Sequence, residues 1–131
     1  MNHPLTLGDS VLDEDHLRLE DLVLQLRDAP LDEVSRRLEA VREHASRHFA
    51  LEDIELRAMA DGNAKCHLDE HAAVLNSLDE VMVVLTQVDV AAEKKALLIN
   101  RLATELHVWL PGHVHEMDAG VASHRSKQRF G

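Results

Sequence analysis

Two histidines four residues apart, His67 and His71, open a long stretch that has an apolar residue at every third or fourth position. On a helix of about 3.6 residues per turn, positions i and i+4 differ in direction by about 40°, so both imidazoles project from one face. The apolar residues that continue this face are Val74, Leu78, Val81, Leu85 and Val88. Such a row is typical of a helix packed in a bundle. Both histidines are therefore expected to point into the core, either as hydrogen-bonded core histidines or as ligands of one metal ion.

Three other segments also carry a histidine or a carboxylate on an apolar face. His16 lies on the apolar face of the first such segment, His48 and Glu52 on that of the second, and His113 on that of the last. A carboxylate removed from water costs free energy unless it is paired or bound to a metal. The position of Glu52, four residues after His48, therefore favours the metal-binding interpretation.

Breaks near Pro30 and Gly62 divide the chain into helical segments joined by short links. We predict helices over about residues 13–28, 31–60, 64–88 and 90–118, after an irregular N-terminal arm and before a flexible tail at 120–131. With 131 residues, the chain is expected to form one domain over its whole length. Short links between long helices predict an all-α fold, an antiparallel up-down-up-down four-helix bundle.

In that topology the starts of the first and third helices lie beside the ends of the second and fourth, so the polar residues on the four seams share one level. Asp118 is expected there too. It follows His113 by five residues, about 140° round an ideal helix, so the backbone must deviate between them. Pro111 and Gly112 are the expected source of this deviation.

The resulting set of five imidazoles and two carboxylates is too large for one tetrahedral zinc, and a lone cysteine excludes zinc-thiolate designs. Two first-row ions bridged by Glu52 and Asp118 would use all seven groups. Mixed nitrogen and oxygen ligation favours iron, with manganese less suited.

Four motifs resemble those of the hemerythrins, in the single-domain bacterial branch of that superfamily with its HHE cation-binding motif. They are Asp15-His16-Leu17, His48-Phe49-Ala50-Leu51-Glu52, His67-Leu68-Asp69-Glu70-His71, and the stretch from Trp109 to Asp118 that reads WLPGHVHEMD. The resemblance implies that His67, His71 and His113 hold one iron and that His16 and His48 hold the other. It also implies that Glu52 and Asp118 bridge the two ions together with an oxo or hydroxo group.

The resemblance further implies a non-haem di-iron protein that binds dioxygen reversibly, for oxygen transport, storage or sensing. By position, Phe49, Trp109, Leu110 and Val114 resemble the residues that line the oxygen pocket of the family, and the same residues would also suit an ordinary bundle core. Two other functions remain open on the same centre. One is a redox enzyme that reduces nitric oxide or decomposes peroxide, and the other is a metal-storage or regulatory module.

The remaining features concern partners and location. A formal net charge of −10 argues against a protein whose surface coats nucleic acid or anionic membranes. The sequence shows no apolar run of about eighteen residues and no leader pattern at its start, so we expect a soluble, cytoplasmic monomer. Any reductant or signalling partner would be a separate molecule.

Overall fold

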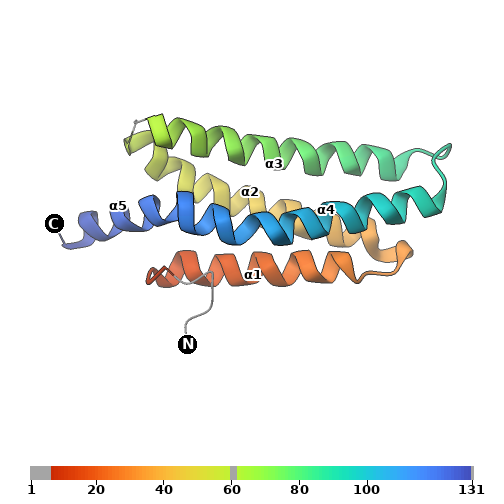
Figure 1. Cartoon of the computed structure of the whole chain (residues 1–131), viewed down its shortest axis with the longest axis horizontal. Coiled ribbons are helices and arrows are strands. Elements are labelled where there is room, and N and C mark those ends of the chain that lie inside the picture. The colour runs from red at the N-terminus through yellow and green to blue at the C-terminus, as the bar shows by residue number, and fades with distance from the viewer. Residues whose placement is uncertain (1–6, 60–61, 131) are drawn as a thin grey trace.

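The structure, a computed structural model, describes residues 7–59 and 62–130. Residues 1–6 of the predicted arm and Asp61 of the predicted turn lie outside the described residues. All the described elements are helical, and they form a bundle, as the predicted all-α class requires. Figure 1 shows the long helices side by side, with the links that follow α1 and α3 at the same end of the bundle. These helices are α1 (Ser10–Arg27), α2 (Val34–Met59), α3 (Gly62–Thr86) and α4 (Ala92–His113).

The first helix begins at Ser10, three residues before the predicted start at position 13. Asp9 caps it, because its Oδ1 accepts hydrogen bonds from the backbone N–H groups of Val11 at 3.1 Å and Leu12 at 3.2 Å. Acidic side chains are favoured at this position because the first N–H groups of a helix have no partner within it. The apolar pattern of α1 could not reveal this cap, because the cap lies outside the pattern.

The links at the end of the bundle away from the candidate site are short. A single 3₁₀ turn, η1 (Leu31–Glu33), follows Pro30 and leads directly into α2. The third helix ends at Thr86, two residues before the end predicted from the apolar row. Val88 therefore lies in the link to α4, where it is 99% exposed, and its predicted place in the core is wrong.

The last helical part of the chain differs most from the prediction. After α4 comes a π-helical segment, η2 (Val114–Asp118), and then α5 (Ala119–Phe130), where the sequence predicts a flexible tail. Arg125 Nε donates a hydrogen bond to Asp9 Oδ2 at 2.7 Å, and a hydrogen bond of 2.8 Å joins His124 Nδ1 to Glu55 Oε2. These contacts attach α5 to the start of α1 and to the later half of α2.

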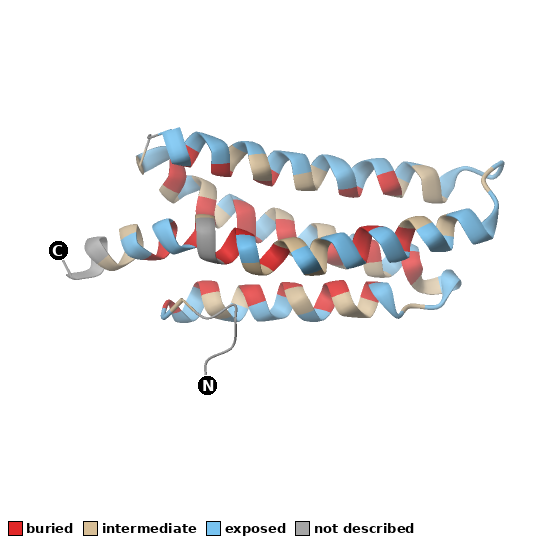
Figure 2. Cartoon of the chain, in the orientation of Figure 1, coloured by how far each residue is buried: buried red, intermediate tan, exposed pale blue. Residues whose placement is uncertain are grey.

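Among the described residues, two apolar clusters make up the core, and Figure 2 shows that the buried residues follow the inward faces of the helices. The larger cluster includes Leu19, Phe49 and Val114, and the smaller one includes Leu12, Leu56 and Val121. Along each helix, the buried polar residues lie between members of these clusters. No helix in the described part of the chain combines the length and hydropathy that a membrane span requires.

Candidate metal centre

The seven polar residues predicted to share one level do lie together. They fall into two groups, and within each group the potential ligand atoms all lie within 4.8 Å of one another. Glu52 and Asp118 belong to both groups. The first group adds His67, His71 and His113, and the second adds His16 and His48. All seven side chains are buried, and Glu52 and His16 have no exposed surface.

The imidazoles point their Nε2 atoms at the two carboxylates. Asp118 faces both groups, since its Oδ1 lies 2.7 Å from His67 Nε2 and its Oδ2 lies 2.9 Å from His16 Nε2. Glu52 also faces both groups through Oε1, at 2.9 Å from His48 Nε2 and 3.6 Å from His71 Nε2. Each carboxylate therefore lies between the two groups of histidines.

The π-helical segment explains how Asp118 joins a cluster that contains His113. A π-helix closes its hydrogen bonds between residues five apart, so it takes more residues per turn than an α-helix and brings positions i and i+5 towards the same face. The segment begins directly after His113 and ends at Asp118. The deviation required by the sequence is therefore present, but it follows Pro111 and Gly112 rather than occurring at them. Pro111 lies within the last turn of α4.

Three further carboxylates hold the outward nitrogens of the histidines. His48 Nδ1 lies 3.0 Å from Asp15 Oδ2, and His71 Nδ1 lies 2.8 Å from Asp53 Oδ1. Glu70 Oε1 is 2.7 Å from His113 Nδ1. A ring N–H donated to an outer carboxylate fixes the orientation of the imidazole and leaves the other nitrogen free to bind a metal.

These three carboxylates are the functional residues that sequence reasoning missed. Each is adjacent in sequence to a residue of the cluster: Asp15 precedes His16, Asp53 follows Glu52, and Glu70 precedes His71. The signal that could have found them is an acidic residue directly beside an inward one, at His16, Glu52 and His71. His44, for which the sequence suggests no ligand role, lies outside both groups, and its Nε2 is 3.0 Å from the backbone oxygen of Asp15.

The two shared carboxyls differ strongly in pKa. Burial, and then the adjacent charge of Asp118, raise the pKa of Glu52 to about 10. Burial would also raise the pKa of Asp118, but the nearby imidazoles of His113, His16 and His67 outweigh it and lower that pKa below its usual range. The pair therefore keeps one proton at neutral pH, because two adjacent buried carboxylates repel each other.

Burial also affects the pKa values of two imidazoles in the cluster. Burial, followed by the neighbouring His67 and His113, lowers the pKa of His71 to about 2. Burial has the same tendency at His113, but Asp118 and Glu70 outweigh it and raise that pKa. His71 is therefore neutral at physiological pH, which is the form that binds metal ions.

The donor set fits a cation, because seven buried polar atoms have no hydrogen-bond partner of suitable geometry among the described residues. These atoms are His16 Nδ1 and Nε2, His48 Nε2, Glu52 Oε1 and Oε2, and Asp118 Oδ1 and Oδ2. A buried polar atom without a partner costs about 1–3 kcal/mol, so a cluster of them requires an explanation. All of them except His16 Nδ1 and Glu52 Oε2 lie within 2.9 Å of another residue of the cluster. A metal cation there would satisfy these atoms together.

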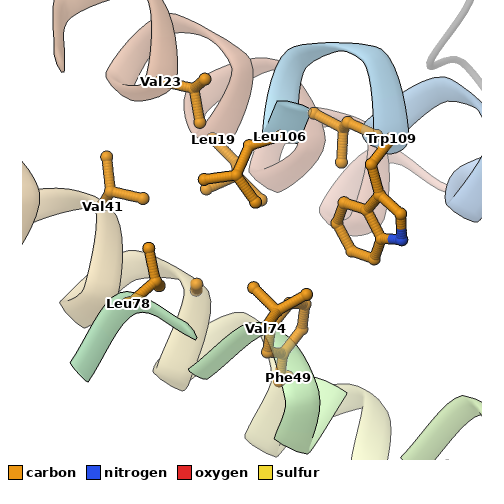
Figure 3. A pocket seen from close by; sticks show the side chains of 10 residues that line it. Leu19, Val23, Val41, Phe49, Val74, Leu78, Leu106 and Trp109 are labelled. Atoms are coloured by element: carbon orange, nitrogen blue, oxygen red, sulfur yellow. The ribbon is translucent and has the colours of Figure 1, made fainter. Parts of the chain in front are cut away.

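Aromatic and apolar side chains cover one side of the cluster. Phe49 stacks on His71 with ring centroids 4.0 Å apart, and Trp109 stacks on His113 at 4.3 Å. Both side chains, together with Leu110, line an apolar cavity inside the bundle (Figure 3). Val114, the fourth predicted pocket residue, is fully buried in the larger apolar cluster but is not among the residues that line this cavity.

Comparison with known proteins gives one family and one curated relative. The family model described as the hemerythrin HHE cation-binding domain matches residues 7–123. The relative is a protein named bacteriohemerythrin from Ralstonia nicotianae (strain ATCC BAA-1114 / GMI1000), 33% identical over 114 residues, which are 87% of this chain and 79% of the relative. No solved structure gives a significant match.

Proposed function

The chain belongs to the hemerythrin family, and from this we propose that it is a non-haem di-iron protein that binds dioxygen reversibly. The observation that carries the proposal is that both shared carboxylates face both groups of histidines. Such sharing is expected where two ions lie side by side and each carboxylate bridges them. A single four-coordinate site would leave three of the seven groups without a role.

We assign His67, His71 and His113 to one iron and His16 and His48 to the other. Glu52 and Asp118, which belong to both groups, would hold both ions. The group that contains His16 and His48 offers one protein ligand fewer than the other, so dioxygen would bind at that ion. This assignment rests on the antiparallel up-down-up-down order of α1 to α4, which brings the starts of α1 and α3 beside the ends of α2 and α4.

The protein contributes orientation and a dry environment to this chemistry. Asp15, Asp53 and Glu70 hold three of the imidazoles through their Nδ1 atoms. Phe49 and Trp109 cover the cluster and keep bulk water from it. Bound iron would supply the redox chemistry that reversible dioxygen binding requires.

The test is anaerobic reconstitution with ferrous iron, followed by metal counting and visible spectroscopy while air is admitted and withdrawn. We expect two irons per chain and an oxygen-dependent band that fades on deoxygenation. His48→Ala should lower the iron content below two, whereas His107→Ala, which alters a half-exposed histidine outside the cluster, should not. Iron that oxidises without returning would favour the redox-enzyme function, and fewer than two irons in the unaltered chain would refute the seven-ligand assignment.

A further inference from the structure

The apolar cavity beside the cluster has room for a small nonpolar molecule. Side chains from α1 to α4 line it, and its volume of about 10 Å³ is about the space that one water-sized molecule needs. Leu19 on α1 and Ala45 on α2, which both line it, lie three residues from His16 and His48. Residues three apart on a helix are neighbours, so the cavity borders His16 and His48. Through Phe49 and Trp109 it also borders the other group of histidines. Because its lining is apolar, water has few partners there and the cavity is expected to stay dry.

A groove between α3 and α4 lies on the other side of one wall of this cavity. The groove has a volume of about 270 Å³, and polar side chains, Glu70, Ser77 and Glu105, line part of it. Val74, Leu106 and Trp109 line both the groove and the cavity. These three residues, which we call the shared wall, therefore separate the groove from the cavity by the thickness of one side chain.

Trp109 is the only member of the shared wall held by a polar contact among the described residues. Its Nε1–H donates a hydrogen bond to Glu70 Oε1 at 2.7 Å, and its ring stacks on His113. In Figure 3 the indole nitrogen points away from the other labelled side chains, while the ring faces the cavity. Val74 and Leu106 are half-buried and make only apolar contacts with the core. A swing of Trp109 out of the wall would therefore require the hydrogen bond to Glu70 to break.

We propose that small nonpolar gases enter the cavity from the α3–α4 groove through the shared wall, and that the hydrogen bond from Trp109 to Glu70 limits how often this wall opens. The part of this proposal that names dioxygen as the physiological gas rests on the proposed function. The cavity and its wall are independent of iron, so they can be tested without it.

The first test uses xenon NMR on the full-length chain without metal. Leu106→Ala thins the shared wall and should raise the exchange rate of xenon between cavity and solvent by about tenfold, within the range over which mutations change association rates. Leu98→Ala is the matched control: this leucine is also half-buried on α4 and packs on the same core, but it lines neither the groove nor the cavity. Val74→Ala opens the same wall if Leu106→Ala does not fold.

A separate variant tests the hydrogen bond from Trp109 to Glu70. Trp109→Phe removes the N–H donor and leaves an aromatic ring in the wall, so xenon exchange should also become faster. Absence of saturable xenon binding, or equal exchange rates in Leu106→Ala and Leu98→Ala, would overturn the passage. An unchanged rate in Trp109→Phe would overturn the role of the hydrogen bond.

The second test uses the iron-loaded protein and stopped-flow measurement of dioxygen binding. A wall that controls passage alone changes association and dissociation by the same factor, because it alters the barrier and not the bound state. Leu106→Ala should therefore raise both rate constants about tenfold and leave the Kd for dioxygen unchanged. A change in Kd without parallel rate changes would contradict the proposal. If the iron-loaded chain fails to bind dioxygen reversibly, the proposed function fails while the xenon result still decides the passage.

Discussion

The orientation of each imidazole depends on carboxylates outside the cluster. His71 shows this most clearly, because its Nδ1 contacts Asp53 while its Nε2 faces Glu52. Asp53 is partly exposed, and burial raises its pKa. Its Oδ1 lies 2.8 Å from His71 Nδ1 and can accept the ring N–H. The inward nitrogen of His71 is therefore left unprotonated, as a metal ligand must be.

Removal of this outer carboxylate should weaken metal binding without removing a ligand. Asp53→Ala is expected to lower iron affinity by about 10- to 100-fold, because His71 loses the partner that fixes its ring. Competition with a ferrous chelator under anaerobic conditions measures the change. Asp79→Ala is the control, since Asp79 pairs with Arg42 on the surface and contacts no residue of the cluster. Equal affinities in the two variants would show that Asp53 has no orienting role.

Six of the seven residues of the cluster could be predicted because each interrupts an apolar row, and a row fixes the direction of every residue in it. Asp118 lies on no such row, so its place could be predicted only together with a deviation of the backbone after His113. The outer carboxylates interrupt no row. Asp15, Asp53 and Glu70 lie beside the inward residues, on flanks where acidic side chains are common. Only the packed helices show which acids reach a histidine on a neighbouring helix.

At the scale of elements, the end of the chain was the part that the sequence could not specify. The pattern required a deviation between His113 and Asp118, but not its kind or its place. The π-helical segment allows the helix to continue, so the chain goes on into α5. The contacts that dock α5 join residues far apart in sequence, Asp9 with Arg125 and Glu55 with His124, which no local pattern reveals.

The contact of Arg125 with Asp9 should contribute measurably to stability. The side chain of Asp9 is 2% exposed and that of Arg125 is 18% exposed, so loss of the guanidinium would remove the cation that pairs with a buried carboxylate. We expect Arg125→Ala to lower the free energy of unfolding by about 2–4 kcal/mol. Arg101→Ala, which breaks a surface pair with Glu105, should change it by less than about 0.5 kcal/mol. Urea unfolding measures both, and similar losses would indicate that α5 is not held by this contact.

At the scale of the whole molecule, the polar cluster lies between two apolar clusters, so it affects the stability of the entire bundle. Two of its side chains have a higher pKa in the folded chain than in the unfolded chain, so they keep their protons to a higher pH. The pKa of Glu52 is raised from 4.5 to about 10, and that of His113 is raised from 6.5. The folded chain without metal therefore holds more protons than the unfolded chain above neutral pH.

This difference predicts how stability depends on pH. Stability falls with rising pH wherever the folded state binds more protons than the unfolded state. The chain without metal should therefore lose stability as the pH rises from about 7 towards about 10, where Glu52 must ionise beside Asp118. Iron replaces the proton of Glu52, so metal binding should release protons near neutral pH and make stability less dependent on pH. Urea unfolding across this range, with and without ferrous iron under anaerobic conditions, measures both effects.

The variant Glu52→Gln tests how much of this pH dependence of stability comes from the carboxyl group of Glu52. The amide is neutral at every pH, so this variant without metal should lose most of the decline in stability and keep only the part due to His113. The same variant should bind iron poorly, because it lacks one bridging carboxylate. A chain without metal whose stability stays constant or rises over this pH range would contradict the prediction. A Glu52→Gln variant that declines as steeply as the unaltered chain would place the proton elsewhere in the cluster.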